Sequence, residues 1–331
     1  MHCSALALAT MKLMRQTLAR LALALPVVWL VVSLVFLLIH LVPGDPIQQM
    51  LGDGASPADL TALRHQYGLD LPLPAQYLHY WSGVVHGDLG SSIRLHETVA
   101  QLIGARYPYT LALTVTALGF GLLLALPAGI LAAVHRGRLL DQAISVVSLF
   151  GLSVPGLALG PVLILIFSIQ LGWLPVSGAN SGGGTMSAGG ISLIDWRYLV
   201  LPSIAMGASL AAILTRMVRT AMLEELGQDY IRTARAKGLS ERAVVCRHAL
   251  PNALVPIITV VGLQFGALLA GAIVTETIFS WPGLGRLTVS AISNRDYALV
   301  QGCLLSIGLT YVLVNLLTDV VYRWVNPRMR G

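Results

Sequence analysis

Residues 229–256 read DYIRTARAKGLSERAVVCRHALPNALVP, a basic and polar segment that lies between two long apolar runs. Gly238 stands where a first short helix should end, because glycine adopts the left-handed conformation without a steric penalty. Ser240 can cap a second helix, Glu241 suits the positive end of that helix, and Pro251 is expected to interrupt it. The segment therefore predicts a helix, a tight turn and a second helix, a shape that can dock in a groove of another protein.

The two short helices are predicted to have a cationic side and an apolar side. The cationic side consists of Arg232, Arg235, Lys237, Arg242 and Arg247. The apolar side is predicted to consist of Ala234, Ala236, Leu239, Ala243, Val244 and Leu250.

The composition indicates an integral membrane protein. Of 331 residues, 56% are hydrophobic and 11% are charged, and the mean hydropathy is +0.76, whereas a soluble domain carries about 25% charged residues. The net charge of +6 does not indicate nucleic-acid binding, because the basic residues lie at the ends of apolar runs, where they orient spans. Cys3, Cys246 and Cys303 have no paired spacing, so neither a disulfide nor a metal site is expected.

Six apolar runs are long enough to cross a hydrocarbon core of about 30 Å at about 1.5 Å per helical residue. They cover residues 21–41 and about 110–134, 143–169, 198–217, 253–275 and 300–322. Lys and Arg are more frequent in the connections that share a side with the N-terminus, so both termini are predicted to be cytoplasmic. We therefore expect an all-α polytopic membrane protein with residues 1–20 in the cytoplasm and 21–41 as its first span.

Residues 42–107 are expected to form a small helical insertion outside the cytoplasm, between the first two spans. Helices are predicted to begin at Ser56-Pro57 and to cover residues 75–85, with Tyr77, Tyr80 and Trp81 at the membrane interface. Residues 108–331 should form the core with the remaining five spans, and residues 222–252 the cytoplasmic segment within it.

Several short motifs occur in order along the chain: PGDP at 43–46, RTARAKGL at 232–239, ALPNA at 249–253, ETIFSWPGLGR at 276–286, RDY at 295–297 and NPR at 326–328. Together they resemble the permeases of binding-protein-dependent ABC importers, in the dipeptide/oligopeptide/nickel branch, and within it the first, B-type subunit. That family has a cytoplasmic loop of the form E-A-A-x3-G-x9-I-x-L-P. Here Arg232-Thr233-Ala234 replaces E-A-A and His248 replaces Ile, while Gly238 and Leu250-Pro251 match the pattern.

The resemblance implies a type I ABC importer permease fold in a bacterial inner membrane. It also implies several partners: a second homologous permease, two ABC ATPase subunits that carry ATP and Mg, and an extracytoplasmic substrate-binding protein. The chain itself should bind no cofactor and catalyse no reaction, and it has no phosphate-binding loop of the G-x4-G-K-[ST] type. The resemblance assigns coupling to the ATPase to Tyr230, Arg232, Thr233, Ala234, Arg235, Ala236, Lys237, Gly238, Leu239, His248, Leu250 and Pro251.

Two further sets of residues lie in and after the fifth apolar run. Gly262, Gly266 and Ala270 recur every four residues and allow close approach of another helix, either of this subunit or of the partner permease along the pore. Gln264 either lines the pathway or bonds a neighbouring helix. After the run, a set of residues is expected to form an outer gate or a docking surface for the binding protein, or alternatively a structural turn: Glu276, Trp281, Pro282 and Gly283.

Asp319, near the inner end of the last run, is expected to pair with Arg323 one turn later, in preference to a proton-coupling role. The predicted function is import of dipeptides or oligopeptides through half of a translocation pore. A nickel or glutathione importer of the same family is an alternative, as are an ATP-independent channel or secondary carrier and a membrane scaffold that transports nothing.

Overall fold

The computed structural model describes residues 23–38, 40–41, 48, 56–66, 69–92, 94–154, 156–179 and 194–325. The motifs at 43–46 and 326–328 and the N-terminal residues 1–20 lie outside the described residues. So does the side chain of Arg323, and with it the predicted pair with Asp319. Over the described residues the chain folds into helices, with an isolated β-bridge between Ser91 and Thr98.

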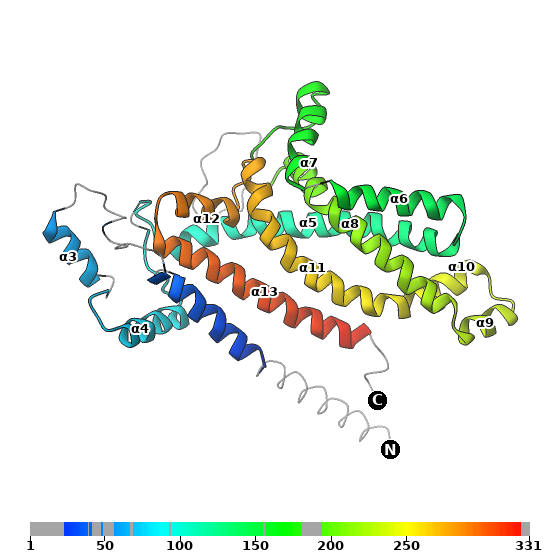
Figure 1. Cartoon of the computed structure of the whole chain (residues 1–331), viewed down its shortest axis with the longest axis horizontal. Helices are drawn as coiled ribbons and strands as arrows, with labels where there is room; N and C mark the ends of the chain where they lie inside the picture. The colour runs from blue at the N-terminus through cyan, green and yellow to red at the C-terminus, as the bar shows by residue number, and fades with distance from the viewer. Residues whose placement is uncertain are drawn as a thin grey trace, which may run out of the picture.

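Four of the described helical segments are long and apolar enough to cross a membrane. They are α5 (Val99–Val134), α8 (Trp196–Leu226), the segment Glu241–Ile278, which contains α11 (Leu250–Ile278), and α13 (Tyr297–Val325). Figure 1 shows these helices running along the length of the molecule, with α8 next to α5 and α11 next to α13. The second, fourth, fifth and sixth predicted spans are therefore confirmed as helices of sufficient length.

α5 and α8 pack closely because small residues repeat along their contact. Ala117, Gly121, Ala125 and Gly129 follow one another at four-residue spacing on α5, and all are buried. A Cβ at Gly129 would lie 2.6 Å from the Cβ of Val218, so the backbones can approach this closely only with glycine there. The sequence contains this repeat, and it would have predicted the contact.

The predicted third span, residues 143–169, is divided in two. α6 (Leu139–Ser153) is followed by α7 (Gly156–Leu163) and the π-helical turn η1 (Ile164–Gln170), with an angle of 96° between the halves. Val154 ends α6 in an extended conformation, with φ of −80° and ψ of 117°. The next residue in the sequence is a proline, and the residue before a proline is sterically excluded from the helical region. The run predicted as the third span is therefore a bent pair of helices.

The first predicted span contains the apolar helix Leu23–Leu38, which packs against the insertion. The insertion contains α3 (Pro57–Gln66) and α4 (Leu73–His86), close to the predicted helix positions. The aromatic residues of α4 pack inward, however: Tyr77 and Tyr80 contact the ring of Phe36, and Trp81 packs in the same cluster. These contacts lie within the subunit, and a location of the three residues at the membrane interface stays a prediction.

Short helices lie at the two ends of the bundle. α9 (Asp229–Ala236) and α10 (Glu241–Ala243) connect α8 to α11 at one end, while α12 (Leu284–Ser293) connects α11 to α13 at the other. Figure 1 shows these connections at opposite ends of the molecule. Two candidate sites from the sequence are therefore separated by the length of the bundle.

Candidate coupling site

The segment that joins α8 to α11 forms the expected helix, turn and helix. Gly238 follows α9 with a φ of +79°, the left-handed conformation that favours glycine. Ser240 caps the next helix, because its Oγ accepts a hydrogen bond of 3.4 Å from the backbone N–H of Ala243. Both local predictions are confirmed. We refer to residues 228–251 as the elbow.

The elbow rests on a buried apolar base. Ile231 and Ala234 of α9 are 0% and 6% exposed and pack in one cluster with Met222 of α8. On the following segment, Val244, Val245 and Ala249 are buried in the same cluster. This base connects the elbow to both long helices, so α9 cannot shift far without moving the ends of α8 and α11.

The predicted apolar side was partly wrong. Ala236 is exposed and Leu239 is 41% exposed, whereas Ile231, which was not included, is fully buried. The left-handed turn at Gly238 redirects the chain, so the helical periodicity of α9 does not continue through Leu239. The base also uses Val245, which follows Val244 in a wider helical turn.

The second helix of the elbow is not interrupted at Pro251. The π-helical turn η2 (Val244–Ala249) leads directly into α11, and the backbone N–H of Leu250 donates to the carbonyl of Val245. Proline has no N–H and its ring clashes with the carbonyl four residues earlier in a regular helix. The wider turn before Pro251 accommodates the proline, so the helix continues where an interruption was predicted.

Hydrogen bonds between polar side chains connect the elbow to both neighbouring helices. The Tyr230 hydroxyl donates to Oε2 of Glu225 on α8 at 2.5 Å and accepts from Nδ2 of Asn252 on α11 at 3.0 Å. Across the turn, Arg235 binds the carboxylate of Glu241 through Nε at 2.7 Å and through Nη2 at 3.3 Å. Glu225, Glu241 and Asn252 were not among the predicted site residues.

The outer surface of the elbow is polar and cationic. Arg232, Lys237, Arg242 and Arg247 are exposed, and Arg232 lies 3.3 Å from a carboxylate oxygen of Asp229. Thr233 and Pro251 are also exposed, while His248 and Leu250 are half-buried. The structure thus brings the predicted coupling residues together on one short segment, with most of its charged groups facing outward.

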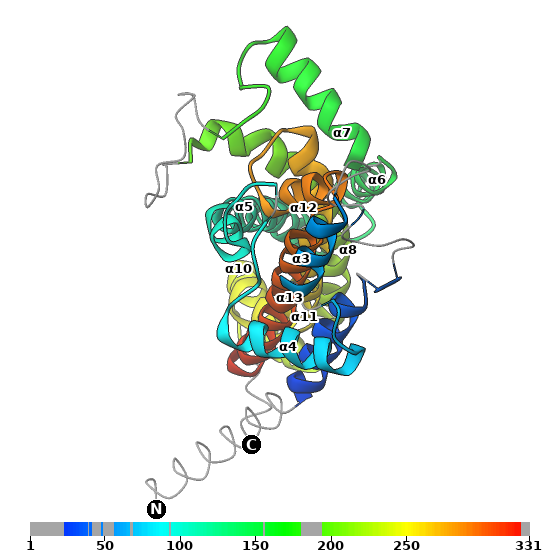
Figure 2. The same ribbon diagram turned by 90° about the vertical axis from the view of Figure 1, so that its left-hand side faces the viewer.

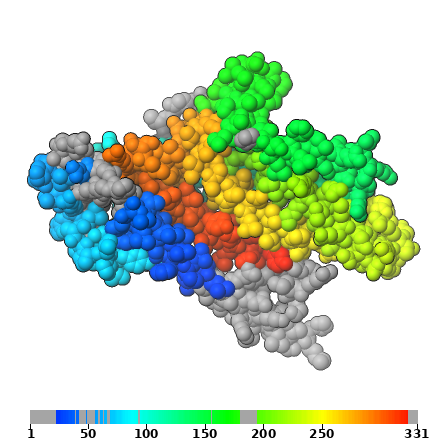
Figure 3. Space-filling view, viewed as in Figure 1, coloured from blue at the N-terminus to red at the C-terminus, as the bar shows by residue number. Residues whose placement is uncertain are grey.

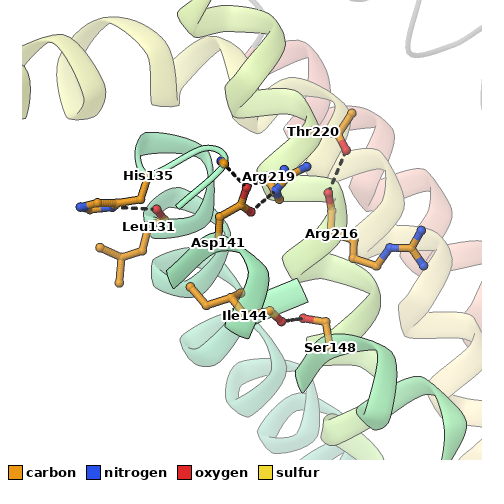
Figure 4. A network of polar contacts seen from close by, with 9 residues as sticks. Leu131, His135, Asp141, Ile144, Ser148, Arg216, Arg219 and Thr220 are labelled. Carbon is orange, nitrogen blue, oxygen red and sulfur yellow. Dashed lines mark hydrogen bonds and ion pairs between the residues drawn. The ribbon is translucent and has the colours of Figure 1, made fainter. Parts of the chain in front are cut away.

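A second polar contact lies near the same end, between α8 and the turn from α5 to α6. Arg219 donates to the two carboxylate oxygens of Asp141, from Nε at 2.6 Å and from Nη2 at 2.9 Å, and the Gly137 N–H donates to the same carboxylate at 2.9 Å. Figure 4 shows Arg216 one turn away, with its side chain directed away from Asp141. Asp141 is 5% exposed and Arg219 is 30% exposed, so the pair attaches the start of α6 to α8.

Two of the predicted pore residues pack against α13, and the other two are half-buried or exposed. A Cβ at Gly262 would lie 2.3 Å from Thr318, and one at Gly266 would lie 2.0 Å from the ring of Tyr311, so both glycines allow α13 to approach. Gln264 is half-buried and Ala270 is exposed. The two glycines thus serve packing within the subunit, and a role at the pore or the partner permease stays a prediction.

At the opposite end, Glu276 in the last turn of α11 is fully buried and faces the start of α12. Its Oε1 accepts from the hydroxyl of Thr110 at 2.6 Å, and its Oε2 accepts from the backbone N–H of Arg286 at 2.9 Å. Thr110 also accepts from the backbone N–H of Leu284 at 2.7 Å. A carboxylate beside the first N–H groups of a helix is favourable, so Glu276 joins the end of α11 to the start of α12 and, through Thr110, to α5.

Trp281 and Gly283 are buried at the same corner, and Pro282 is half-buried. The indole Nε1 of Trp281 donates to the carbonyl of Tyr109 at 2.9 Å, and a Cβ at Gly283 would lie 2.1 Å from Oε1 of Glu276. Three of the four residues predicted as a gate or docking surface therefore have no exposed side to offer a binding protein in this conformation. The structural turn with an aromatic anchor, which was the alternative, describes their contacts, and a gating role stays a prediction.

The fold and motifs define an inner-membrane transport subunit. The model of the family described as "Binding-protein-dependent transport system inner membrane component" matches residues 125–331, and a companion model of its N-terminal region matches residues 13–114. The chain belongs to this family: it is the permease subunit of an ABC importer, in the dipeptide/oligopeptide/nickel branch. It is a transport subunit and not an enzyme, and ATP hydrolysis belongs to separate subunits.

Individual relatives agree with this assignment. The chain is 43% identical over 306 residues to the glutathione transport system permease protein GsiC of Escherichia coli O6:H1, across 92% of this chain and 95% of that protein. The protein of the same name from Shigella dysenteriae serotype 1 is 42% identical over the same length. An inward-facing structure of the MetNI methionine ABC transporter superposes with a TM-score of 0.56 at 21% identity, covering 68% of this chain and 96% of that one. The last comparison shows a shared permease fold.

Proposed function

We propose that the chain forms half of a translocation pore that imports short peptides, with a second homologous permease forming the other half. The relatives named above are glutathione permeases, and glutathione is itself a tripeptide. This favours glutathione as the first compound to test within the peptide class expected from the sequence. Selection of the substrate would rest largely on an external binding protein.

The elbow is the proposed contact with an ATPase subunit. The observation that carries this proposal is its construction: a buried base of Ile231, Ala234 and Val244 under an exposed cationic surface. An isolated surface loop would move without affecting the spans. Because the elbow packs on α8 and continues into α11, a displacement of its outer surface would tilt both helices.

When two ATPase subunits close around ATP, they would push on the elbow, which would act as a lever. The movement would switch the pore between its inward-open and outward-open states. Positive-inside bias supports a cytoplasmic position for the elbow and for both termini, and it leaves α12 on the external side. In that orientation, the external face would receive the binding protein and the cytoplasmic face the ATPases.

Uptake by the assembled transporter tests the substrate. Proteoliposomes that contain the chain, its partner permease and the ATPases, with the binding protein added outside, should accumulate labelled glutathione or short peptides only when ATP is enclosed in the lumen. Labelled nickel under the same conditions should stay at background. Nickel uptake that unlabelled peptides fail to reduce would refute the peptide assignment, and uptake without ATPase subunits would favour the channel or secondary carrier.

Two measurements test the elbow. Cys246, which is exposed on it, should form crosslinks to an ATPase subunit with a short bifunctional thiol reagent. Gly238→Leu should reduce assembly and substrate-stimulated ATP hydrolysis while membrane insertion persists, because leucine is strained at a φ of +79°. Gly238→Asn, which tolerates that conformation, is the matched control. Normal transport by Gly238→Leu would count against the lever.

A further inference from the structure

The outward side of α4 carries two flanks of different polarity. Successive helical residues are about 100° apart, so residues seven positions apart share nearly the same direction. Leu78 and Val85 are 68% and 71% exposed and share one flank. His79 and His86 are also exposed and share a second flank, about 100° around the helix.

The inward face of α4 is fixed to the apolar helix Leu23–Leu38. The hydroxyl of Tyr77 lies 2.7 Å from Oγ of Ser33, and the ring centroids of Tyr77 and Tyr80 lie 5.2 Å and 5.8 Å from that of Phe36. Trp81 packs in the same cluster. α4 is thus held beside this helix, at the level of Ser33 and Phe36, and does not lie beyond its end.

The helix Leu23–Leu38 presents an apolar exterior on its other sides. Leu30 is 50% exposed, Leu34 57% and Leu37 45%, and in an inner-membrane subunit such side chains face lipid. Figure 3 shows this helix and α4 side by side on one face of the molecule. Figure 2, which looks along the bundle, shows α4 from its side, crossing the direction of the long helices.

The composition of α4 separates it from an ordinary surface helix. Its sequence, LPAQYLHYWSGVVH, contains no Asp, Glu, Lys or Arg. A helix with one face in water usually carries charged residues there. An uncharged helix with an apolar flank next to a lipid-facing span fits the boundary between acyl chains and headgroups.

We propose that α4 is a membrane-surface helix, with the Leu78/Val85 flank among lipid acyl chains and the His79/His86 flank in the headgroup and water layer. The occupant of the apolar flank is lipid, because this flank continues the lipid-facing exterior of Leu23–Leu38. Such a contact holds the insertion against the bilayer. This inference depends on membership of the membrane family and goes beyond the proposed substrate and coupling roles.

Fluorescence quenching on the full-length chain tests the proposal. Single cysteines at Leu78→Cys, His79→Cys, Val85→Cys and His86→Cys are made in a background in which the native cysteines are replaced. Each variant is labelled with bimane and reconstituted in vesicles of phosphatidylethanolamine and phosphatidylglycerol. Quenching is then measured with phospholipids doxyl-labelled near the start of the acyl chain and, separately, with aqueous iodide.

The labels at 78 and 85 should be quenched by the doxyl lipids at least about twofold more than those at 79 and 86, and iodide should show the reverse order. Equal quenching of neighbouring positions would overturn the proposal. So would protection of 78 and 85 from both quenchers, which would mean that protein covers the flank. All four positions are exposed, and a size-exclusion profile like that of the parent checks folding. Positions 78 and 79 form one adjacent pair and positions 85 and 86 form another. If one variant aggregates, the pair that does not contain it still gives a result.

Discussion

The two ends of the bundle hold their connecting helices by different means. At the end that carries the elbow, α9 is attached through buried apolar side chains such as Ile231, and charged groups such as the Arg235–Glu241 pair stay at the surface. At the opposite end, α12 is held by the buried carboxylate of Glu276, which accepts hydrogen bonds from the Thr110 hydroxyl and a backbone N–H.

These two kinds of attachment should respond differently when the connecting helix is displaced. A buried, fully bonded carboxylate fixes one geometry, because any shift leaves donors unpaired in an apolar interior. An apolar base under exposed charges tolerates small adjustments, and exposed ion pairs are weak enough to exchange partners. The chain thus combines a rigid joint at α12 with an adaptable contact surface at the elbow.

Removal of the buried carboxylate should have the largest effect on stability. Glu276→Ala leaves the Thr110 hydroxyl and the Arg286 N–H without this acceptor, and should lower the free energy of unfolding by about 3 kcal/mol. Thermal unfolding of the purified chain in detergent measures the change. Thr277→Ala, at the exposed neighbouring position, should cost below about 0.5 kcal/mol. Equal effects of the two variants would contradict the rigid joint.

The second effect concerns the attachment of α6 to α8. Arg219→Ala leaves the buried carboxylate of Asp141 with the Gly137 N–H but without its charged partner, and should cost about 2 kcal/mol. Arg216→Ala removes an exposed arginine one turn away and serves as the control. The same unfolding assay applies, and a similar loss in both variants would mean that the pair adds nothing specific.

Substitutions at Gly238, in the turn of the elbow, should change the free energy of unfolding less than the two preceding variants. At Gly238 a Cβ would meet nothing within 4 Å, so Gly238→Ala costs only the strain of the left-handed conformation, about 1 kcal/mol. Gly238→Asn should recover much of that loss, since asparagine adopts this conformation more readily. If both substitutions were neutral in the unfolding assay, the turn would not depend on glycine.

The exposed ion pair of the elbow should matter least for stability. Arg235 and Glu241 are 42% and 63% exposed, so Glu241→Gln should cost about 0.5 kcal/mol or less. The difference from the parent should vanish in about 0.5 M salt, because salt screens exposed charges. A loss as large as that of Glu276→Ala would remove the distinction between the two ends.

Local features of the elbow could be predicted because neighbouring residues decide them. Gly238 and Ser240 act through their own backbone conformation and a bond to a residue three positions on. Small residues at four-residue spacing on α5 also indicate a close helix contact, but the contact of α5 with α8 was not predicted. The Asp141–Arg219 pair joins residues 78 positions apart, and Glu276 and Thr110 are 166 apart, so no local pattern indicates them.

The sequence by itself determined that the chain enters a membrane, where its main spans lie, how the elbow turns and which transporter family it belongs to. Apolar runs, turn residues and ordered motifs carry that information within short stretches. Only the tertiary structure decided that Glu276 is buried under α12 and that the aromatic face of α4 turns inward. Each of these depends on which distant surface covers a side chain, and folding alone brings those surfaces together.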